Sequence, residues 1–167
     1  MPDLTHDMRA RCLILACGNT LREDDGVGPW LAQWAEERFA GEPRVRIIVR
    51  QQWTPELAQD VAEAESVIFV DCATNATPGS VQVGPVEPAS ARSGFGTHHL
   101  GAAELLALSK EVYGVIQRSS LLLKVGAGSL ELREGFSKVV KAALPGACAQ
   151  LEKAVLEILA KPSSQRP

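Results

Sequence analysis

The sequence alternates short apolar runs with segments of helical periodicity, and this alternation limits the fold more than any other feature. The runs have the length and composition of buried strands, and the segments between them repeat apolar residues every three or four positions. Chains of this kind form a three-layer α/β fold, in which a mostly parallel sheet carries helices on both faces. We predict five strands, at residues 11–17, 44–49, 66–71, 81–86 and 119–128.

Helices are predicted between and after these strands, at residues 27–39, 55–64, 98–114 and 137–160. The Pro145-Gly146 pair is expected to kink or split the last helix, because proline lacks an N–H and clashes with the preceding turn. Asp24 or Asp25 is expected to cap the first helix with its carboxylate.

Composition favours one globular unit and excludes several classes of partner. With 167 residues, 46% of them apolar, we expect a single domain over residues 1–167, with a core at about 11–160 and disordered termini. The net charge of −3 argues against nucleic acid as the main partner. There is neither a bilayer-length apolar run nor a secretory signal, so we expect a cytoplasmic protein without a membrane partner, most simply a monomer. The cysteines form no C-x-x-C pair and are expected to be buried and reduced; they are Cys12, Cys17, Cys72 and Cys148.

Polar side chains follow the predicted strands at the points where they end. Asp24 and Asp25 follow the first strand, Asp71 ends the third, and a histidine pair, His98-His99, follows the fourth. The ligand crevice of an open α/β sheet lies outside the carboxyl ends of its strands, so these groups converge if strands one and three are neighbours. Two carboxylates and one imidazole can hold a divalent transition metal with positions open for water or substrate. Such a metal polarises a carbonyl or lowers the pKa of a bound water.

Each of these features also has a simpler interpretation. An Asp-Asp-Gly after a strand is often only a turn with a helix cap, and a histidine pair at a helix start is often only solvated or capping. Other chemistries do not fit: the chain has no G-x-G-x-x-G, no G-x-x-x-x-G-K-[ST] and no G-x-S-x-G. The acidic triplet at 23–25 would also repel a pyrophosphate.

Taken in order, the motifs resemble those of the endopeptidases that mature the large subunit of nickel–iron hydrogenases. The similarity covers about residues 12–160. The matching segments are GNTLREDDGVG at 18–28, TPEL at 54–57, VIFVD at 67–71, THHLG at 97–101 and the strand end at 125–126. The sequence departs from the family at Cys17, where glycine is common, and in the segment 126–137, which lacks a proline often present there.

The resemblance implies an enzyme that removes the C-terminal extension of a hydrogenase large-subunit precursor once nickel has been inserted. The catalytic and metal-contacting residues that it implies are Asp25, Asp71 and His98. Nickel is expected to arrive with the precursor, which is the expected partner, and other divalent metals are expected to be able to substitute for it. The secondary candidates are Asp24 (a cap or a supporting group), His99, Asn19 and Gly26.

Three other functions fit the same motifs. The chain would be a non-catalytic chaperone that senses the metallated precursor, or a related metal-dependent protease with another substrate. The blandest interpretation is an α/β domain whose acidic loop is only a helix cap. Within the enzyme hypothesis, a carboxylate serves either as a metal ligand or as a general base, and the sequence does not choose between the two roles.

Overall fold

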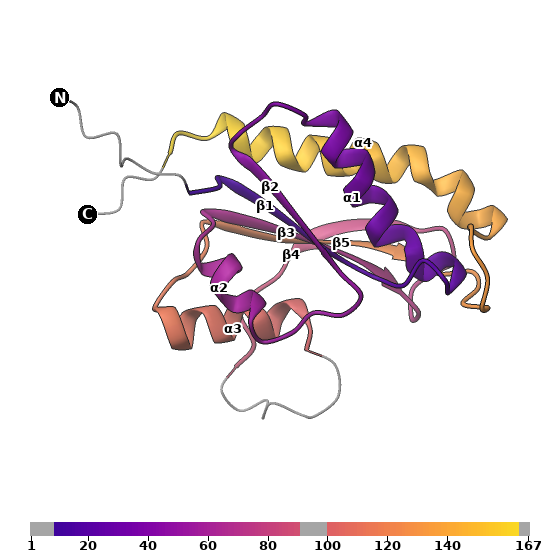
Figure 1. Ribbon diagram of the computed structural model, residues 1–167, viewed down its shortest axis with the longest axis horizontal. Helices are drawn as coiled ribbons and strands as arrows, with labels where there is room; N and C mark the ends of the chain where they lie inside the picture. Colours follow the sequence, from indigo (N-terminus) through magenta and orange to yellow (C-terminus); the bar gives the residue numbers. More distant parts are fainter. Residues whose placement is uncertain (1–8, 91–99, 164–167) are drawn as a thin grey trace.

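The computed structural model describes residues 9–90 and 100–163, in which a five-stranded sheet lies between two layers of helices (Figure 1). The strand order is β2-β1-β3-β5-β4; β4 alone is antiparallel to its neighbour. The predicted three-layer α/β class is confirmed, and β1 and β3 are neighbours. The strands are β1 (Cys12–Cys17), β2 (Val45–Arg50), β3 (Ser66–Ala73), β4 (Val81–Pro85) and β5 (Ser119–Gly126).

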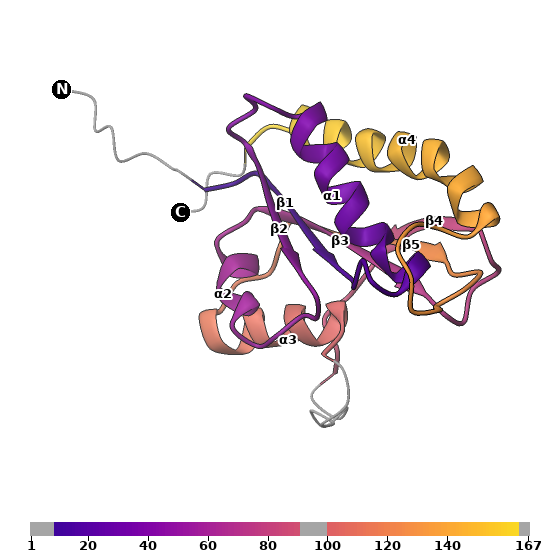
Figure 2. The same cartoon turned by 45° about the vertical axis from the view of Figure 1, so that its right-hand side comes forward.

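Two helices cover each face of the sheet (Figure 2). The strands supply both cores by alternation, so that Ile14 packs towards α1 and α4 while Leu15 packs towards α2 and α3. Both faces of β1 are buried, which explains its continuous apolar run. No helix of the described residues is long and apolar enough to cross a bilayer. The helices are α1 (Val27–Arg38), α2 (Leu57–Ala62), α3 (Ala102–Tyr113) and α4 (Lys138–Ala160); a 3-10 turn, η1 (Glu23–Gly26), precedes α1.

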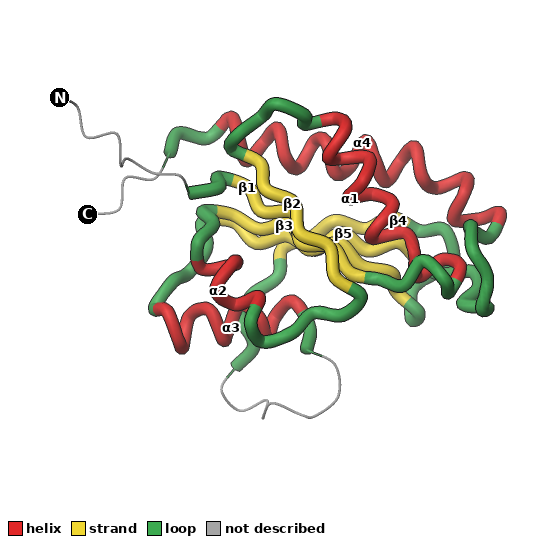
Figure 3. The backbone as a smooth tube through the Cα atoms, in the orientation of Figure 1, coloured by secondary structure: helices red, strands yellow, loops and turns green. Residues whose placement is uncertain are grey.

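Helix α4 continues through Pro145, so the split that the sequence suggested does not occur (Figure 3). Pro145 and Gly146 lie on the exposed side of the helix, where water can hydrate the carbonyl that loses its N–H partner. The neighbouring Leu144 and Ala147 are buried against the sheet and hold the two halves in line.

The end of β1 and the start of α1 touch each other. A Cβ added to Gly28 would lie 2.2 Å from the carbonyl oxygen of Cys17, so only glycine permits this approach. Gly18, with φ of +149°, turns the chain out of β1, and a Cβ there would lie 1.9 Å from the carbonyl oxygen of Asp25. The nine residues between the strand and the helix are therefore pressed against the strand end that they leave.

Gly28→Ala is expected to lower the free energy of unfolding by about 2–4 kcal/mol, because the added methyl group forces the helix away from the strand. Gly146→Ala is the matched control, since its Cβ would meet nothing within 4 Å and alanine favours a helix. Urea unfolding of both variants measures the difference. A Gly28→Ala protein as stable as wild type would show that the contact between strand and helix is dispensable.

Candidate functional site

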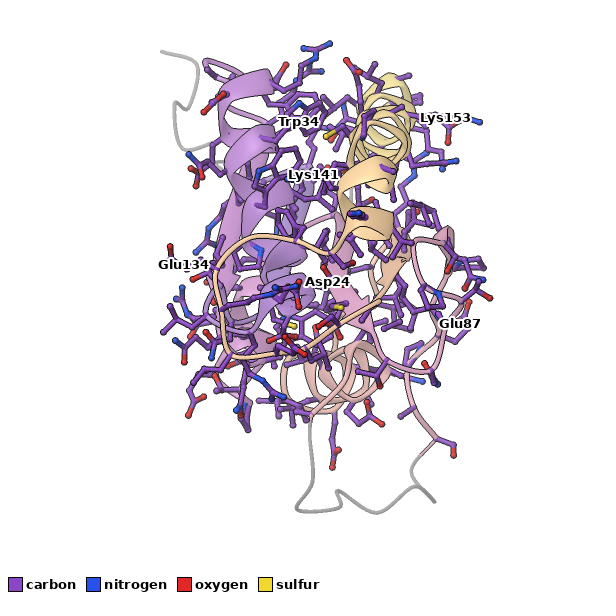
Figure 4. All side chains as sticks on the ribbon, turned by 90° about the vertical axis from the view of Figure 1, so that its right-hand side faces the viewer. Asp24, Trp34, Glu87, Glu134, Lys141 and Lys153 are labelled. Atoms are coloured by element: carbon purple, nitrogen blue, oxygen red, sulfur yellow. The ribbon has the colours of Figure 1, made fainter. Side chains whose placement is uncertain are left out.

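The acidic loop (residues 18–26) and the loop that follows β5 (residues 127–137, hereafter the β5–α4 loop) meet at the carboxyl edge of the parallel strands. Figure 4 views the molecule onto this edge, with Asp24 beneath the arch of the β5–α4 loop. This edge is where open α/β sheets bind ligands. The site is thus built by two segments that are about a hundred residues apart in the sequence.

Asp24 joins these two loops and is completely buried. Its carboxylate accepts hydrogen bonds from the backbone N–H groups of Gly128 at 2.8 Å, Ser129 at 2.9 Å and Ser137 at 2.8 Å, and from the Ser137 hydroxyl at 2.6 Å. Burial opposes its ionisation, but the hydrogen bonds from Ser137, Ser129 and Gly128 outweigh burial and lower the pKa of Asp24. Asp24 is therefore a charged structural anchor and has no oxygen left for a ligand.

The predicted capping of α1 by Asp24 or Asp25 is wrong. Gly26 is the N-cap residue, and no side chain caps the helix. Asp24 is committed to the β5–α4 loop, and Asp25 instead closes the acidic loop by accepting a hydrogen bond at 2.8 Å from the backbone N–H of Asn19 on its Oδ2. Asp25 is partly exposed, unlike its neighbour. The pair thus divides into a buried anchor and an accessible carboxylate.

Asp71 lies in β3 beside the end of β1. Its Oδ1 accepts hydrogen bonds from the Cys17 thiol at 3.3 Å and from the backbone N–H of Cys72 at 2.8 Å, which fixes the orientation of the carboxylate. Burial raises the pKa of Asp71, and the negative charge of nearby Asp25 raises it further, against the two hydrogen bonds. All four cysteines are free, as expected, and burial raises the pKa of Cys72 to about 12, so this thiol is no nucleophile.

Asp25 and Asp71 form a carboxylate pair without a counter-charge. Within residues 9–90 and 100–163, no lysine or arginine forms an ion pair with either of them. The same residues contain no group of three or more potential metal-ligating side chains. Burial is the main reason why the pKa of Asp71 is raised; a cation near the pair would offset the added repulsion from Asp25, and an anion would increase it.

His98 and His99 lie outside the described residues, so their expected role at the site stays a prediction. One premise for it needs correction: β4 is antiparallel to β5, so its carboxyl end lies at the opposite edge of the sheet from the end of β3. The first residue of α3, Ala102, shares a buried cluster with Cys17 at the end of β1.

Sequence reasoning missed Glu23, whose side chain is only 1% exposed. Glu23 forms an ion pair with Arg133, and its backbone N–H donates to the Arg133 carbonyl at 2.8 Å. The hydrogen bond from Arg133 is the main reason why the pKa of Glu23 is lowered. The sequence could not predict the burial of Glu23, because three consecutive acidic residues show no pattern that singles out a buried one. Its partner, Arg133, is also 110 residues away in the sequence.

Comparison with known proteins identifies the fold. No protein-family model and no curated protein matches the sequence. Among solved structures, the chain is similar to the hydrogenase maturating endopeptidase HybD from E. coli, with a TM-score of 0.74, 24% identity, and coverage of 88% of this chain and 93% of that one. It is also similar to a hydrogenase 2 maturation peptidase from a Thaumarchaeota archaeon, with a TM-score of 0.63, 26% identity, and coverage of 87% and 97%.

The chain has the fold of the hydrogenase maturation endopeptidases. A third structure, the [NiFe] hydrogenase maturation protease HycI from Thermococcus kodakarensis, agrees with this, with a TM-score of 0.63, 24% identity, and coverage of 91% of this chain and 94% of that one. The family resemblance seen in the sequence is thereby confirmed. The match covers 93–97% of the length of these three maturation endopeptidases.

Asp24→Asn is expected to cost about 2–4 kcal/mol of unfolding free energy near neutral pH, because the amide group places donors opposite the donors of the β5–α4 loop. The pKa of Asp24 is lowered in the folded protein, so its stabilisation is present above the unfolded value of 3.8 and is lost as the pH falls through the folded value. Urea titrations over this range test both points. Asp25→Asn is the control and should cost less than about 1 kcal/mol; equal losses would contradict the division of roles.

Asp71→Asn is expected to stabilise the metal-free protein by about 0.5–1 kcal/mol near neutral pH. The pKa of Asp71 is raised in the folded protein, so wild type loses stability as the pH rises from the unfolded value of 3.8 through the folded value. The advantage of the variant should therefore vanish in acid. Thermal unfolding across this range measures it, with Glu157→Gln on the exposed side of α4 as the control, and a variant less stable than wild type at neutral pH would contradict the pKa assignment.

Proposed function

We propose that this protein is a cytoplasmic endopeptidase that removes the C-terminal extension of a nickel–iron hydrogenase large-subunit precursor after nickel has been inserted. The observation that carries the proposal is the unneutralised pair of Asp25 and Asp71 at the carboxyl edge of a hydrogenase maturation endopeptidase fold. The E. coli and Thermococcus relatives are hydrogenase maturation enzymes by name. Nickel in this proposal is part of the substrate and arrives with the precursor.

The donor set fits a divalent cation. Asp25 uses Oδ2 for the Asn19 N–H and Asp71 uses Oδ1 for the Cys17 and Cys72 donors, so each carboxylate keeps a second oxygen that makes no hydrogen bond to a described residue. Carboxylates and an imidazole suit nickel and similar metals, and His98 would be the third ligand. When bound, the metal polarises the scissile carbonyl.

The residues of the chain itself orient the reacting groups and handle the proton. Asn19 and Gly18 hold Asp25 at the end of β1, and the Cys17 thiol holds Asp71 in one orientation. Burial raises the pKa of Asp71, which suits this carboxylate to accept a proton from the attacking water. Since a bound cation relieves the repulsion between the carboxylates, the site works best when the precursor brings its metal.

The test is cleavage of a purified large-subunit precursor, prepared with and without nickel, followed as a mobility shift. Wild type should cut only the nickel-loaded form, and Asp25→Asn, Asp71→Asn and His98→Gln should each slow cleavage by at least about 100-fold. Asp60→Asn, a carboxylate on α2 remote from the site, is the control and should cleave like wild type.

Two outcomes would overturn this assignment in favour of its rivals. A stable complex with the metallated precursor but no loss of the extension would indicate a chaperone. Cleavage of unstructured peptides without nickel would indicate a protease with another substrate.

A further inference from the structure

Strand β4 is one of the two edge strands of the sheet. It pairs with β5 and with no other described strand, so one side of its backbone has no strand partner. The N–H and C=O groups on such a side are a template for pairing with another extended chain. The other edge strand is β2, which pairs with β1 alone among the described strands. The sheet therefore has two open edges at which a further strand could be added.

The hydrogen bonds to β5 show which backbone groups of β4 are free. The Ser80 carbonyl accepts a hydrogen bond from the N–H of Gly126 at 2.8 Å, and the N–H of Val86 donates to β5 at 3.0 Å. Backbone direction alternates along an antiparallel strand, so the even-numbered residues face β5 and the odd-numbered ones face away from it. Val81 and Val83 therefore direct two N–H donors and two carbonyl acceptors towards the open edge.

The position of Pro85 agrees with this alternation. Proline has no N–H to donate, and an edge strand tolerates it where that group would face away from the neighbouring strand. Pro85 is the last residue of β4 and, like Val81 and Val83, an odd-numbered one. It therefore leaves the pairing with β5 intact and blocks only the last position of the open edge.

The two edges differ in charge. Native proteins protect edge strands with charged side chains, which deter pairing with a further chain. Strand β2 carries two exposed arginines, Arg46 and Arg50. Strand β4, with the sequence Val-Gln-Val-Gly-Pro, has no charged side chain. The β2 edge is therefore protected against an added strand, whereas the β4 edge is protected only by its terminal proline.

The two faces of β4 favour a partner strand of alternating polarity. Val81 and Val83 pack against the core that α1 and α4 share. Val139, at the start of α4, keeps 45% of its surface exposed and lies against Gly79, which closely precedes β4. On the opposite face of the strand, Gln82 is exposed. An added strand would therefore bury apolar side chains towards α4 and present polar ones to water on the other face.

The open edge begins close to the proposed reaction site. Lys124 of β5 pairs with Asp71 on one side and with Gln82 of β4 on the other. Neighbouring strands are about 4.8 Å apart, so a strand added to β4 would lie roughly 14 Å from β3. An extended chain covers that distance in about four or five residues. A polypeptide that is cut at Asp71 therefore reaches the open edge with the residues that flank the reacting bond.

We propose that the open edge of β4 binds an extended segment of the precursor, near its cleavage site, as a sixth strand of the sheet; this assignment rests on the proposed function. The backbone of the segment pairs with Val81 and Val83, and its apolar side chains cover Val139. Main-chain hydrogen bonds supply the affinity, and the alternation of apolar and polar side chains supplies the selectivity. A segment fixed at β4 also sets the direction in which the chain crosses the two carboxylates.

Hydrogen–deuterium exchange with single-residue resolution tests the pairing directly. The Asp71→Asn protein is mixed with nickel-loaded precursor, so that the complex forms without being cut. The amides of Val81 and Val83 should exchange at least about tenfold more slowly in the complex, because their N–H groups gain acceptors. The outward-facing amides of Ile47 and Val49 on β2 are the internal control and should not change. Unchanged exchange at Val81 and Val83 in the saturated complex would overturn the proposal.

Proline variants of the two edges test whether the pairing contributes to catalysis. Val83→Pro removes one outward N–H and leaves the hydrogen bonds to β5 in place. It should raise KM for the precursor by about tenfold and leave kcat nearly unchanged, because the segment binds remote from the reacting bond. Val83→Thr keeps the N–H and the branched shape and should retain the wild-type KM. Ile47→Pro makes the same change on the β2 edge and is the matched control.

Circular dichroism checks that both proline variants fold, and the exchange measurement needs neither of them. A wild-type KM in a folded Val83→Pro protein would contradict a role of strand addition in substrate binding.

Failure of the strand addition and failure of the proposed function give different results. A wild-type protein that cleaves no precursor would defeat the proposed function, while the exchange measurement still decides whether the precursor pairs with β4. Cleavage by wild type without protection of Val81 and Val83 in the complex would defeat the strand addition alone. Protection that appears without precursor and rises with the concentration of this protein would show that two copies pair, and would also refute the proposal.

Discussion

The hydrogen bonds that converge on the buried carboxylate of Asp24 connect the acidic loop with the β5–α4 loop at the site. They bind the β5–α4 loop to the turn that leaves β1, and the ion pair between Glu23 and Arg133 reinforces the connection. A charge buried in this way is tolerated only when its oxygens are fully satisfied, and here donors from three residues satisfy them. The orientation of everything nearby, including Asp25, depends on that arrangement.

Two aspartates at the site, Asp24 and Asp71, have pKa values shifted in opposite directions. Hydrogen-bond donors outweigh burial and lower the pKa of Asp24, whereas burial, followed by the charge of Asp25, raises the pKa of Asp71. The first arrangement stabilises the fold, and the second leaves a local repulsion that a cation relieves. A site that is poorly neutralised in the free protein is suited to a substrate that brings its own metal.

The sequence alone predicted the three-layer fold and the grouping of Asp25 with Asp71, because continuous apolar runs and strand-end positions are local signals. The sequence could not predict features that depend on a contact with a residue far away along the chain. Asp24 has the local context of a helix cap, and only contacts more than a hundred residues away reveal it as an anchor. The direction of β4 and the persistence of α4 through Pro145 likewise depend on tertiary packing rather than on local propensity. The histidines remain a sequence-based prediction.

The contact between Gly28 and the Cys17 carbonyl has a consequence for the evolution of the site. Residues 18–27 leave the strand and return to touch it, so they form a nearly closed ring whose circumference is fixed. Insertions or deletions there would displace either the reacting carboxylate or the whole of α1. Diversity in substrate choice is more easily accommodated in the β5–α4 loop, where Leu132 is 84% exposed.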